Sequence, residues 1–375
     1  MLSSSVTAFA GLRGQWLELS TGLAHRGYRF GLSETLSPRL GVVWDFEGNG
    51  RSRLWAEWSR SRPEPGDAVA RRLAGALEVS REFWDARSGR QTTPPGSVAV
   101  ADGLEPATHD QAVLGVEYEL LARLSVGGAV VHQRQRDGVA VLSVDGGETF
   151  VVGAPGGASW PEALRADRWR AMTWARKQLS AGWQAELQLE WRQSKGTWSG
   201  ESPAETADAR HEWLRDVVVP AALDGAYGPL ADDRQWSGRL LASWTVARGS
   251  VVSGRVSWTS GAPVSRLAAL GDGFGADRRF VEPRGTAGRT PSLCRVDGLW
   301  SRRWGVRGGE LEMRFEVLNV LDQQRAVAVD ERWSVLTDLD ADGLGAGAQR
   351  TSQTWGSALL TQRPRELRVG VAYSW

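Results

Sequence analysis

The chain has 375 residues, and its 45 basic and 44 acidic side chains leave a formal net charge of +1. Because nucleic acids attract strongly basic surfaces, this balance gives no electrostatic basis for binding them. The mean hydropathy is −0.33 and no apolar run is long enough for a transmembrane helix, but both properties also fit a membrane β-barrel, whose lumen-facing residues are polar.

Two β-hairpins are predicted near the N-terminus. The first pairs Val6–Arg13 with Trp16–Tyr28, and the second pairs Leu36–Trp44 with Arg53–Ser61. The dipeptide Asn49-Gly50, which lies between the strands of the second hairpin, is a strong signal for a tight turn because both residue types tolerate positive φ. The N-terminal part of the chain is therefore expected to form antiparallel strands.

The long polar stretch Arg62–His109 comes next, and within it the segment Val69–Phe83 is ambiguous. Its apolar residues fit the spacing of a helix and also the alternation of a strand, so both interpretations stay open. A third hairpin is clear, because apolar residues alternate with small or acidic ones over Ala112–Leu120, and a second apolar stripe follows over Leu124–Val130.

Three further hairpins are separated by long stretches rich in Gly and Asp. They pair Trp169–Leu179 with Trp183–Ser194, Leu240–Val246 with Val252–Trp258, and Leu293–Trp304 with Leu311–Val317. The alternation is best between Trp183 and Trp191, where single Gln or Glu residues separate the apolar ones. Side chains of the two kinds then point to opposite faces of the strand.

The C-terminal segment Arg365–Trp375 repeats this two-faced pattern. Its apolar positions are Leu367, Val369, Val371, Tyr373 and Trp375. The segment has about the length that a tilted strand needs to cross a bilayer, and it ends on an aromatic residue. It is typical of the closing strand of an outer-membrane β-barrel, and we expect the barrel assembly machinery to recognise it through the strand that ends at Trp375.

The connections between the expected strands alternate between short and long, as in outer-membrane barrels with tight periplasmic turns and large external loops. A basic side chain such as Arg192, Arg314 or Arg368 would cost roughly 2–4 kcal/mol if it faced lipid near mid-membrane, so we expect these residues to face the lumen. The 20 Trp residues, against 4 Tyr and 8 Phe, suit aromatic girdles at the membrane surfaces. The sequence therefore predicts an all-β, antiparallel transmembrane barrel.

The number of expected strands also predicts the direction of the first one. Roughly thirteen strands are expected, and because the closing strand should descend to the periplasm, the first strand should descend as well. Bacterial single-chain barrels have even strand numbers. The odd count therefore indicates a missing N-terminal part, and the stretch from Met1 to Gly14 shows no signal peptide.

Several stretches follow one another in the order seen in one known family. They are Leu36–Asp45, Val113–Leu121, Ala226–Arg234, Thr259–Pro263, Glu282–Pro291, Glu316–Asp322 and the C-terminal segment. Together they resemble the TonB-dependent outer-membrane receptors, and among these the Oar-like group, which has an N-terminal carboxypeptidase-regulatory-like domain.

The resemblance implies a 22-stranded barrel that encloses a globular plug, which couples to the TonB complex and the proton gradient. Residues 1–375 are expected to hold only the C-terminal barrel portion, as a partial barrel domain without the plug or the regulatory-like domain. Contact with the TonB complex is then expected only through the missing plug. The implied location is the outer membrane of a Gram-negative cell.

No catalytic constellation is visible, so neither an enzymatic activity nor a cofactor is expected. His25, His109, His132 and His211 lack the spacing of metal ligands, and His132 continues an apolar stripe. Cys294 is the only cysteine and is expected to be a small packed residue.

One acidic stretch matches the start of a calcium-binding loop, in which carboxylates two residues apart converge on one ion. Its carboxylates are Asp338, Asp340 and Asp342, and Gln349 stands where a bidentate Glu is expected. An ordinary acidic external loop is the alternative, and the same holds for the weaker candidate Gly271–Asp277.

Trp198, Trp213 and Trp236 are candidates either for ligand contact in the external loops or for the aromatic girdle. The expected function is energised uptake or translocation of an unknown ligand by a receptor barrel, present here as a truncated chain. A surface adhesion or structural barrel and a passive pore are the alternatives. Outer-membrane lipid is an expected partner in each case, and nucleic acid is not.

Overall fold

The structure is a computed structural model, which describes residues 5–20, 27–63, 81–85, 89–93, 97–101, 104–143, 149–154, 163–197, 223–269, 278–306, 308–336 and 349–375. These residues form β-strands joined by turns and loops. In the described ranges no helix is long and apolar enough to cross a membrane.

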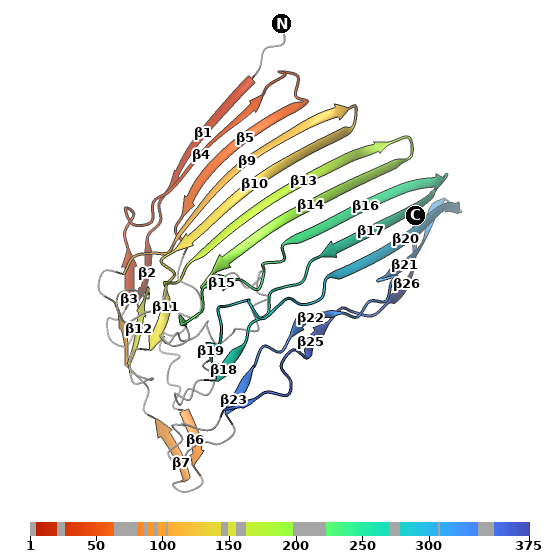
Figure 1. The fold of residues 1–375 in the computed structure, drawn as a ribbon. Helices are drawn as coiled ribbons and strands as arrows, with labels where there is room; N and C mark the ends of the chain where they lie inside the picture. The colour runs from red at the N-terminus through yellow and green to blue at the C-terminus, as the bar shows by residue number, and fades with distance from the viewer. Residues whose placement is uncertain are drawn as a thin grey trace.

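One curved antiparallel sheet of thirteen strands dominates the described part of the chain (Figure 1). Its spatial order follows the chain through β1 (Ser5–Arg13), β4 (Ser37–Asp45), β5 (Ser52–Ser61), β9 (Thr108–Leu121), β10 (Leu124–Arg136), β13 (Ala166–Ser180), β14 (Trp183–Gly196), β16 (Trp236–Ala247), β17 (Ser250–Thr259), β20 (Leu293–Val306), β21 (Gly309–Leu318) and β26 (Glu366–Ser374). The short β15 (Gly228–Pro229) pairs with the end of β14. The expected number of roughly thirteen strands and the antiparallel class are therefore confirmed, but β15 has only two residues and lies off the path of the other twelve strands.

The short connections of the sheet lie along one edge and the long ones along the opposite edge, which we call the turn end and the loop end (Figure 1). Two of the tight turns hold non-glycine residues at positive φ, namely Arg123 at 69° and Ala181 at 51°. Both turns fall where the sequence predicts them. The alternation of short and long connections is thus a property of the fold.

The prediction of the first hairpin was wrong for its second strand, Trp16–Tyr28. Strand β1 pairs directly with β4, and residues of the expected strand Trp16–Tyr28 form a separate small sheet of β2 (Leu17–Ser20) with β3 (Gly27–Phe30). The buried Thr35 brings the chain back beside the end of β1, where β4 begins. Its Oγ1 accepts a hydrogen bond from the Gln15 amide at 3.1 Å and donates one to the Gln15 carbonyl.

This pairing also reverses the expected direction of the first strand. Ser5 lies opposite Asp45 at the turn end, and Arg13 lies opposite Ser37 at the loop end. Strand β1 therefore runs from the turn end to the loop end, whereas β26 runs from the loop end to the turn end. The expectation that the first strand runs in the same direction as the last one was wrong.

The long connections fold into small sheets at the loop end (Figure 1). Their strands are β6 (Arg81–Asp85), β7 (Gly89–Thr93), β8 (Ser97–Val100), β11 (Ala140–Ser143), β12 (Thr149–Gly153), β18 (Leu267–Ala269), β19 (Arg278–Phe280), β22 (Ala326–Val329), β23 (Ser334–Leu336), β24 (Gln349–Thr351) and β25 (Ala358–Thr361). Most of the ambiguous segment Val69–Phe83 lies outside the described residues, and only its last residues belong to a described strand, β6.

The buried apolar cluster of the described chain lies in these loop-end segments and includes Leu164, Leu223, Leu267 and Phe280. The large sheet is not covered in the same way. Along the strands the apolar side chains stay accessible, as Leu187 at 41% and Val369 at 64% show. A sheet that leaves such side chains uncovered by protein needs an apolar environment on that face.

Candidate functional site

Cross-strand register places the apolar stripes of neighbouring strands side by side on one face of the sheet. Leu187 of β14 lies opposite Leu240 of β16, and Leu240 lies opposite Val256 of β17. The same face continues to the last strand, where Phe315 lies opposite Val369. We call this surface the outer face.

Tryptophans border the outer face at both heights. Trp183 and Trp244 lie opposite each other near the turn end, and Trp191 lies opposite Trp236 near the loop end. Trp236 is 51% exposed and belongs to this border, so its placement is that of a girdle residue. The other two candidates for ligand contact, Trp198 and Trp213, lie outside the described residues.

The opposite surface, which we call the inner face, carries a ladder of ion pairs. They are Arg53–Glu117 (2.7 Å), Arg192–Glu190 (2.9 Å), Arg170–Glu190 (3.6 Å), Arg176–Glu186 (3.5 Å), Arg239–Glu186 (3.3 Å), Arg295–Asp297 (2.7 Å), Arg314–Glu312 (2.7 Å) and Arg368–Glu366 (2.7 Å). Exposed pairs of this kind contribute about 0–1 kcal/mol each to stability. Their main consequence is a wall that stays charged and hydrated, on which Arg192, Arg314 and Arg368 lie as expected.

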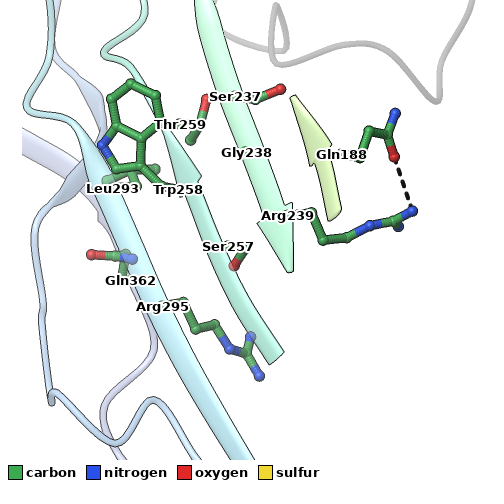
Figure 2. Close-up of a pocket in the computed structure, with 10 residues that line it drawn as sticks. All are labelled: Gln188, Ser237, Gly238, Arg239, Ser257, Trp258, Thr259, Leu293, Arg295 and Gln362. Atoms are coloured by element: carbon green, nitrogen blue, oxygen red, sulfur yellow. Dashed lines mark hydrogen bonds between the residues drawn. The ribbon is translucent and has the colours of Figure 1, made fainter. Parts of the chain in front are cut away.

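A hollow of about 410 Å³ lies among β14, β16, β17 and β20 and includes the loop residue Gln362 (Figure 2). Arg239 donates a hydrogen bond from Nη2 to Gln188 Oε1 at 3.0 Å. Arg295 lies on the neighbouring strand, where Asp297 holds it at 2.7 Å. With the hydroxyl of Ser257 between them, these groups form a donor-rich surface that suits an oxygen-rich ligand.

At the loop end of the sheet, hydrogen bonds connect residues that are distant in sequence. We call this group the loop collar, and it consists of Ser194, Asp233, Gly261 and Arg289. Arg289 donates from Nη1 to the carbonyl oxygens of Asp233 and Gly261, at 2.5 and 3.1 Å, and from Nη2 to Asp233 Oδ2 at 2.5 Å. Asp233 Oδ1 accepts the Ser194 amide at 2.7 Å. The end of β14 and two loops distant in sequence are thereby joined at one carboxylate.

Gly261 shows why the loop collar needs a residue without a side chain. A Cβ at this position would lie 1.6 Å from the carbonyl oxygen of Thr290. The close approach lets the Ala262 amide bond to Thr290 Oγ1 at 2.9 Å, while the Thr290 amide donates to the Ala262 carbonyl at 2.8 Å. The stretches Thr259–Pro263 and Glu282–Pro291 are therefore locked together.

A second loop-end cluster surrounds Arg266 and Asp330. The Arg266 guanidinium lies 4.7 Å from the ring centre of Trp333 and 5.0 Å from that of Trp355. Burial raises the pKa of Asp330, but hydrogen bonds from the Arg332 side chain and amide outweigh it, and the net effect lowers this pKa to about 2. The carboxylate is thus held in its charged form and anchors the segment after β22.

The structure tests only some of the predictions made for candidate chemical residues. Asp338, Asp340 and Asp342, the Gly271–Asp277 stretch, His25 and His211 lie outside the described residues, so the calcium site stays a prediction. Within the described ranges no cluster of three or more His, Cys, Asp or Glu side chains is suited to a metal ion.

Of the remaining three candidates, His109 lies in β9 opposite Gln135, and the other two lie on the outer face. His132 stacks on Trp169 with ring centres 4.2 Å apart, which agrees with the stripe that the sequence indicates. Cys294 is opposite Trp258 and partly exposed. Its expected role as a packed residue thus holds only in part.

Sequence reasoning missed the roles of Asp233 and Arg289. Both fall in stretches that the sequence comparison singles out, Ala226–Arg234 and Glu282–Pro291, but no local pattern pairs them. The sequence shows only that each is a charged residue beside small residues, in loops that are otherwise rich in Gly and Ala. This pattern indicates a structural role for both residues but does not identify their partners.

No family model matches the chain. In sequence it is similar to the TonB-dependent transporter Oar of Myxococcus xanthus, with 22% identity over 92% of this chain and 39% of the relative. The chain thus spans less than half the length of that relative.

Solved structures show the same architecture. The chain superimposes on the outer membrane transporter YddB of Escherichia coli with a TM-score of 0.57 and 13% identity, over 90% of this chain and 40% of YddB. For the FrpB iron transporter of Neisseria meningitidis the TM-score is 0.56 at 14% identity, over 98% of this chain and 42% of FrpB. For the siderophore receptor PiuA of Acinetobacter baumannii it is 0.55 at 12% identity, over 98% and 40%.

Proposed function

Because the chain is a homologue of the TonB-dependent outer-membrane transporters over their barrel-forming part, we propose that it supplies lumen wall and external loops to such a transporter. The outer face contacts lipid, and the inner face lines the path of the ligand. The observation that carries this proposal is the segregation of the sheet, in which ion-paired side chains such as Arg239 and Glu186 lie on one face and Leu187 and Leu240 on the other.

We propose further that residues 1–375 act together with a plug and additional strands, since the chain spans 39% of its relative. The plug, on the same polypeptide or another, occupies the inner face and couples to the TonB complex. Energised uptake or translocation then belongs to the whole assembly.

The ligand is an oxygen-rich molecule in this proposal, because the hollow beside Arg239, Ser257 and Arg295 presents guanidinium and hydroxyl donors. Two of the similar structures are named as a siderophore receptor and an iron transporter. At 12% and 14% identity these likenesses support the fold, and they do not choose a ligand.

A photoreactive amino acid at Gln188 tests the proposal in intact cells. On the inner face this residue should cross-link to a polypeptide segment that mass spectrometry identifies as a plug domain, and the yield should change when the proton gradient is dissipated. The matched control is Leu187, one residue away on the outer face, which should give lipid adducts and no plug. If Gln188 captures no plug segment and the purified chain makes liposomes leak to small sugars, the protein is a passive pore and the proposal fails.

A further inference from the structure

The outer face carries a row of charged residues just beyond its aromatic border at the loop end. Trp58, Ala112, His132, Trp169 and Gln193 lie opposite one another across five neighbouring strands. Two residues further toward the loop end, the register aligns Arg60, Asp110, Arg134, Asp167 and Lys195. Strands rise about 3.3 Å per residue, so the charged row lies about 7 Å beyond the aromatic one.

This position is where a membrane protein tolerates charges. Tryptophans mark the boundary between hydrocarbon and headgroups, and charged side chains on the lipid face cost little once they reach that boundary. The charged row is therefore at the height of the lipid headgroups and outside the lumen. Its side chains meet the outer leaflet and not the transported ligand.

Some charged side chains of this row have an oppositely charged partner in the part of the chain that the structure describes, and others do not. Asp110 is already shared by Arg60, at 2.6 and 3.0 Å, and by Arg136, at 2.8 Å. Within the described residues, neither Arg134 nor Lys195 has a carboxylate within ion-pair distance, while Asp167 lies 3.3 Å from His132 Nε2. Two cations of the row are thus available to an external anion.

These cations line a hollow. A cavity of about 230 Å³ is bounded by Arg134, Arg165, Asp167, Lys195 and Tyr227, together with Trp169 and Gln193. Arg165 lies 4.7 Å from the ring centre of Tyr227, which holds its guanidinium at the rim. Arg134 and Lys195 bring two positive charges to this cavity and Asp167 brings one carboxylate, which His132 already contacts, so the cavity favours an anion. Since a water molecule occupies about 30 Å³ of liquid, the space admits a phosphate group with its hydration.

We infer that this cavity binds a phosphate group on the headgroup of an outer-leaflet glycolipid. Arginine and lysine are the side chains that recognise phosphate oxygens, through charge-assisted hydrogen bonds. The apolar stripe immediately below, which includes Val130 and Trp169, accommodates the acyl chains of the same molecule. Binding of this lipid would hold the barrel at a fixed depth and orientation, and it does not depend on the transport proposal.

The test uses the full chain purified from outer membranes and reconstituted in nanodiscs that contain a phosphorylated glycolipid, with lipid retention measured by native mass spectrometry. The double variant Arg134→Gln/Lys195→Gln should bind the lipid about 30-fold more weakly, since each cation near a membrane surface contributes roughly a factor of five. The matched control is Arg176→Gln/Arg314→Gln on the inner face, which removes the same charge and should leave retention unchanged.

A second arm keeps the wild-type protein and changes the lipid. The wild type should retain the same glycolipid without its phosphate groups about as weakly as the double variant retains the phosphorylated lipid. Because this comparison of two lipids uses the wild-type protein alone, its result does not depend on how the variant folds. Equal retention of the phosphorylated lipid by wild type and double variant would overturn the inference. So would binding of inorganic phosphate at this cavity without retention of the lipid.

Discussion

The loop collar gives the prediction that the structure supports in most detail. Arg289→Met removes the guanidinium that faces Asp233, whose residue exposure is only 2%. Breaking a buried ion pair by removing one partner costs about 3–5 kcal/mol. Arg289 itself is 31% exposed, so water partly replaces it, and Asp233 keeps the Ser194 amide. We therefore expect a cost of about 2–3 kcal/mol, confined to the loops.

Hydrogen exchange followed by mass spectrometry measures this cost locally. The amides of Thr290 and Asp233 donate to the carbonyl oxygens of Ala262 and Leu230, next to the collar. Their exchange should accelerate about 30- to 140-fold, because each 1.4 kcal/mol corresponds to a factor of ten. Peptides from β9 and β10 should exchange as in the wild type. The double variant Asp233→Asn/Arg289→Met should recover part of the protection, since no buried charge is left.

The matched control is Arg279→Met, because Arg279 is an exposed arginine of β19 outside the collar. If Arg289→Met and Arg279→Met accelerate exchange equally, the collar does not hold the loops and the reasoning is refuted.

Three further predictions follow from single positions. A Cβ at Gly115 would lie 2.2 Å from the Trp55 ring, so Gly115→Ala should destabilise the barrel by about 1–3 kcal/mol. Gly298→Ala, where nothing lies within 4 Å, should be neutral, and heat-modifiable gel migration compares the two. Leu187→Arg should cost about 2–4 kcal/mol on the outer face, whereas Glu186→Arg on the wet inner face should cost less, and equal losses in folded yield would contradict the assignment of the faces. The pKa of Asp330 is lowered from 3.8 to about 2 in the folded protein, so its contribution to stability is present above pH 4 and is lost as the pH falls through 2. Asp330→Asn should therefore weaken the loop-end structure at pH 7 and not at pH 2, as read from the fluorescence of Trp333 and Trp355.

Much of the large sheet could be predicted from the sequence because alternation is a local signal. Trp183–Trp191 and Leu367–Trp375 show their two faces without reference to any partner strand, and the structure assigns the same faces. The tight turns were equally readable, since short connections leave neighbouring strands no other partner. The strands and the identity of the wet face are therefore encoded locally.

The error at Trp16–Tyr28 has a different origin. Leu17–Ser20 and Phe30 have the composition of strands, but pairing within the connection competes with pairing in the large sheet. The hydrogen bonds between Gln15 and Thr35 favour the local hairpin. Such a competition depends on contacts across the turn, which periodicity does not report.

The candidate site was the least predictable part. Asp233 and Arg289 meet only because two loops distant in sequence are brought to one edge of the sheet, and neither residue carries a signal for the other. The charged outer row was hidden for a related reason, because Arg134, Asp167 and Lys195 become neighbours through strand register alone. Residue types were visible in the sequence, and their partners were not.

Nitroxide side chains at Leu187 and Glu186, placed one at a time in the reconstituted protein, test the two-faced sheet most directly. Power-saturation measurements compare collisions with oxygen, which is concentrated in lipid, and with a water-soluble nickel chelate. The label at position 187 should favour oxygen strongly, and the label at position 186 should favour the nickel chelate. Indistinguishable accessibility of the two labels would contradict a lipid-facing outer wall and a hydrated inner one.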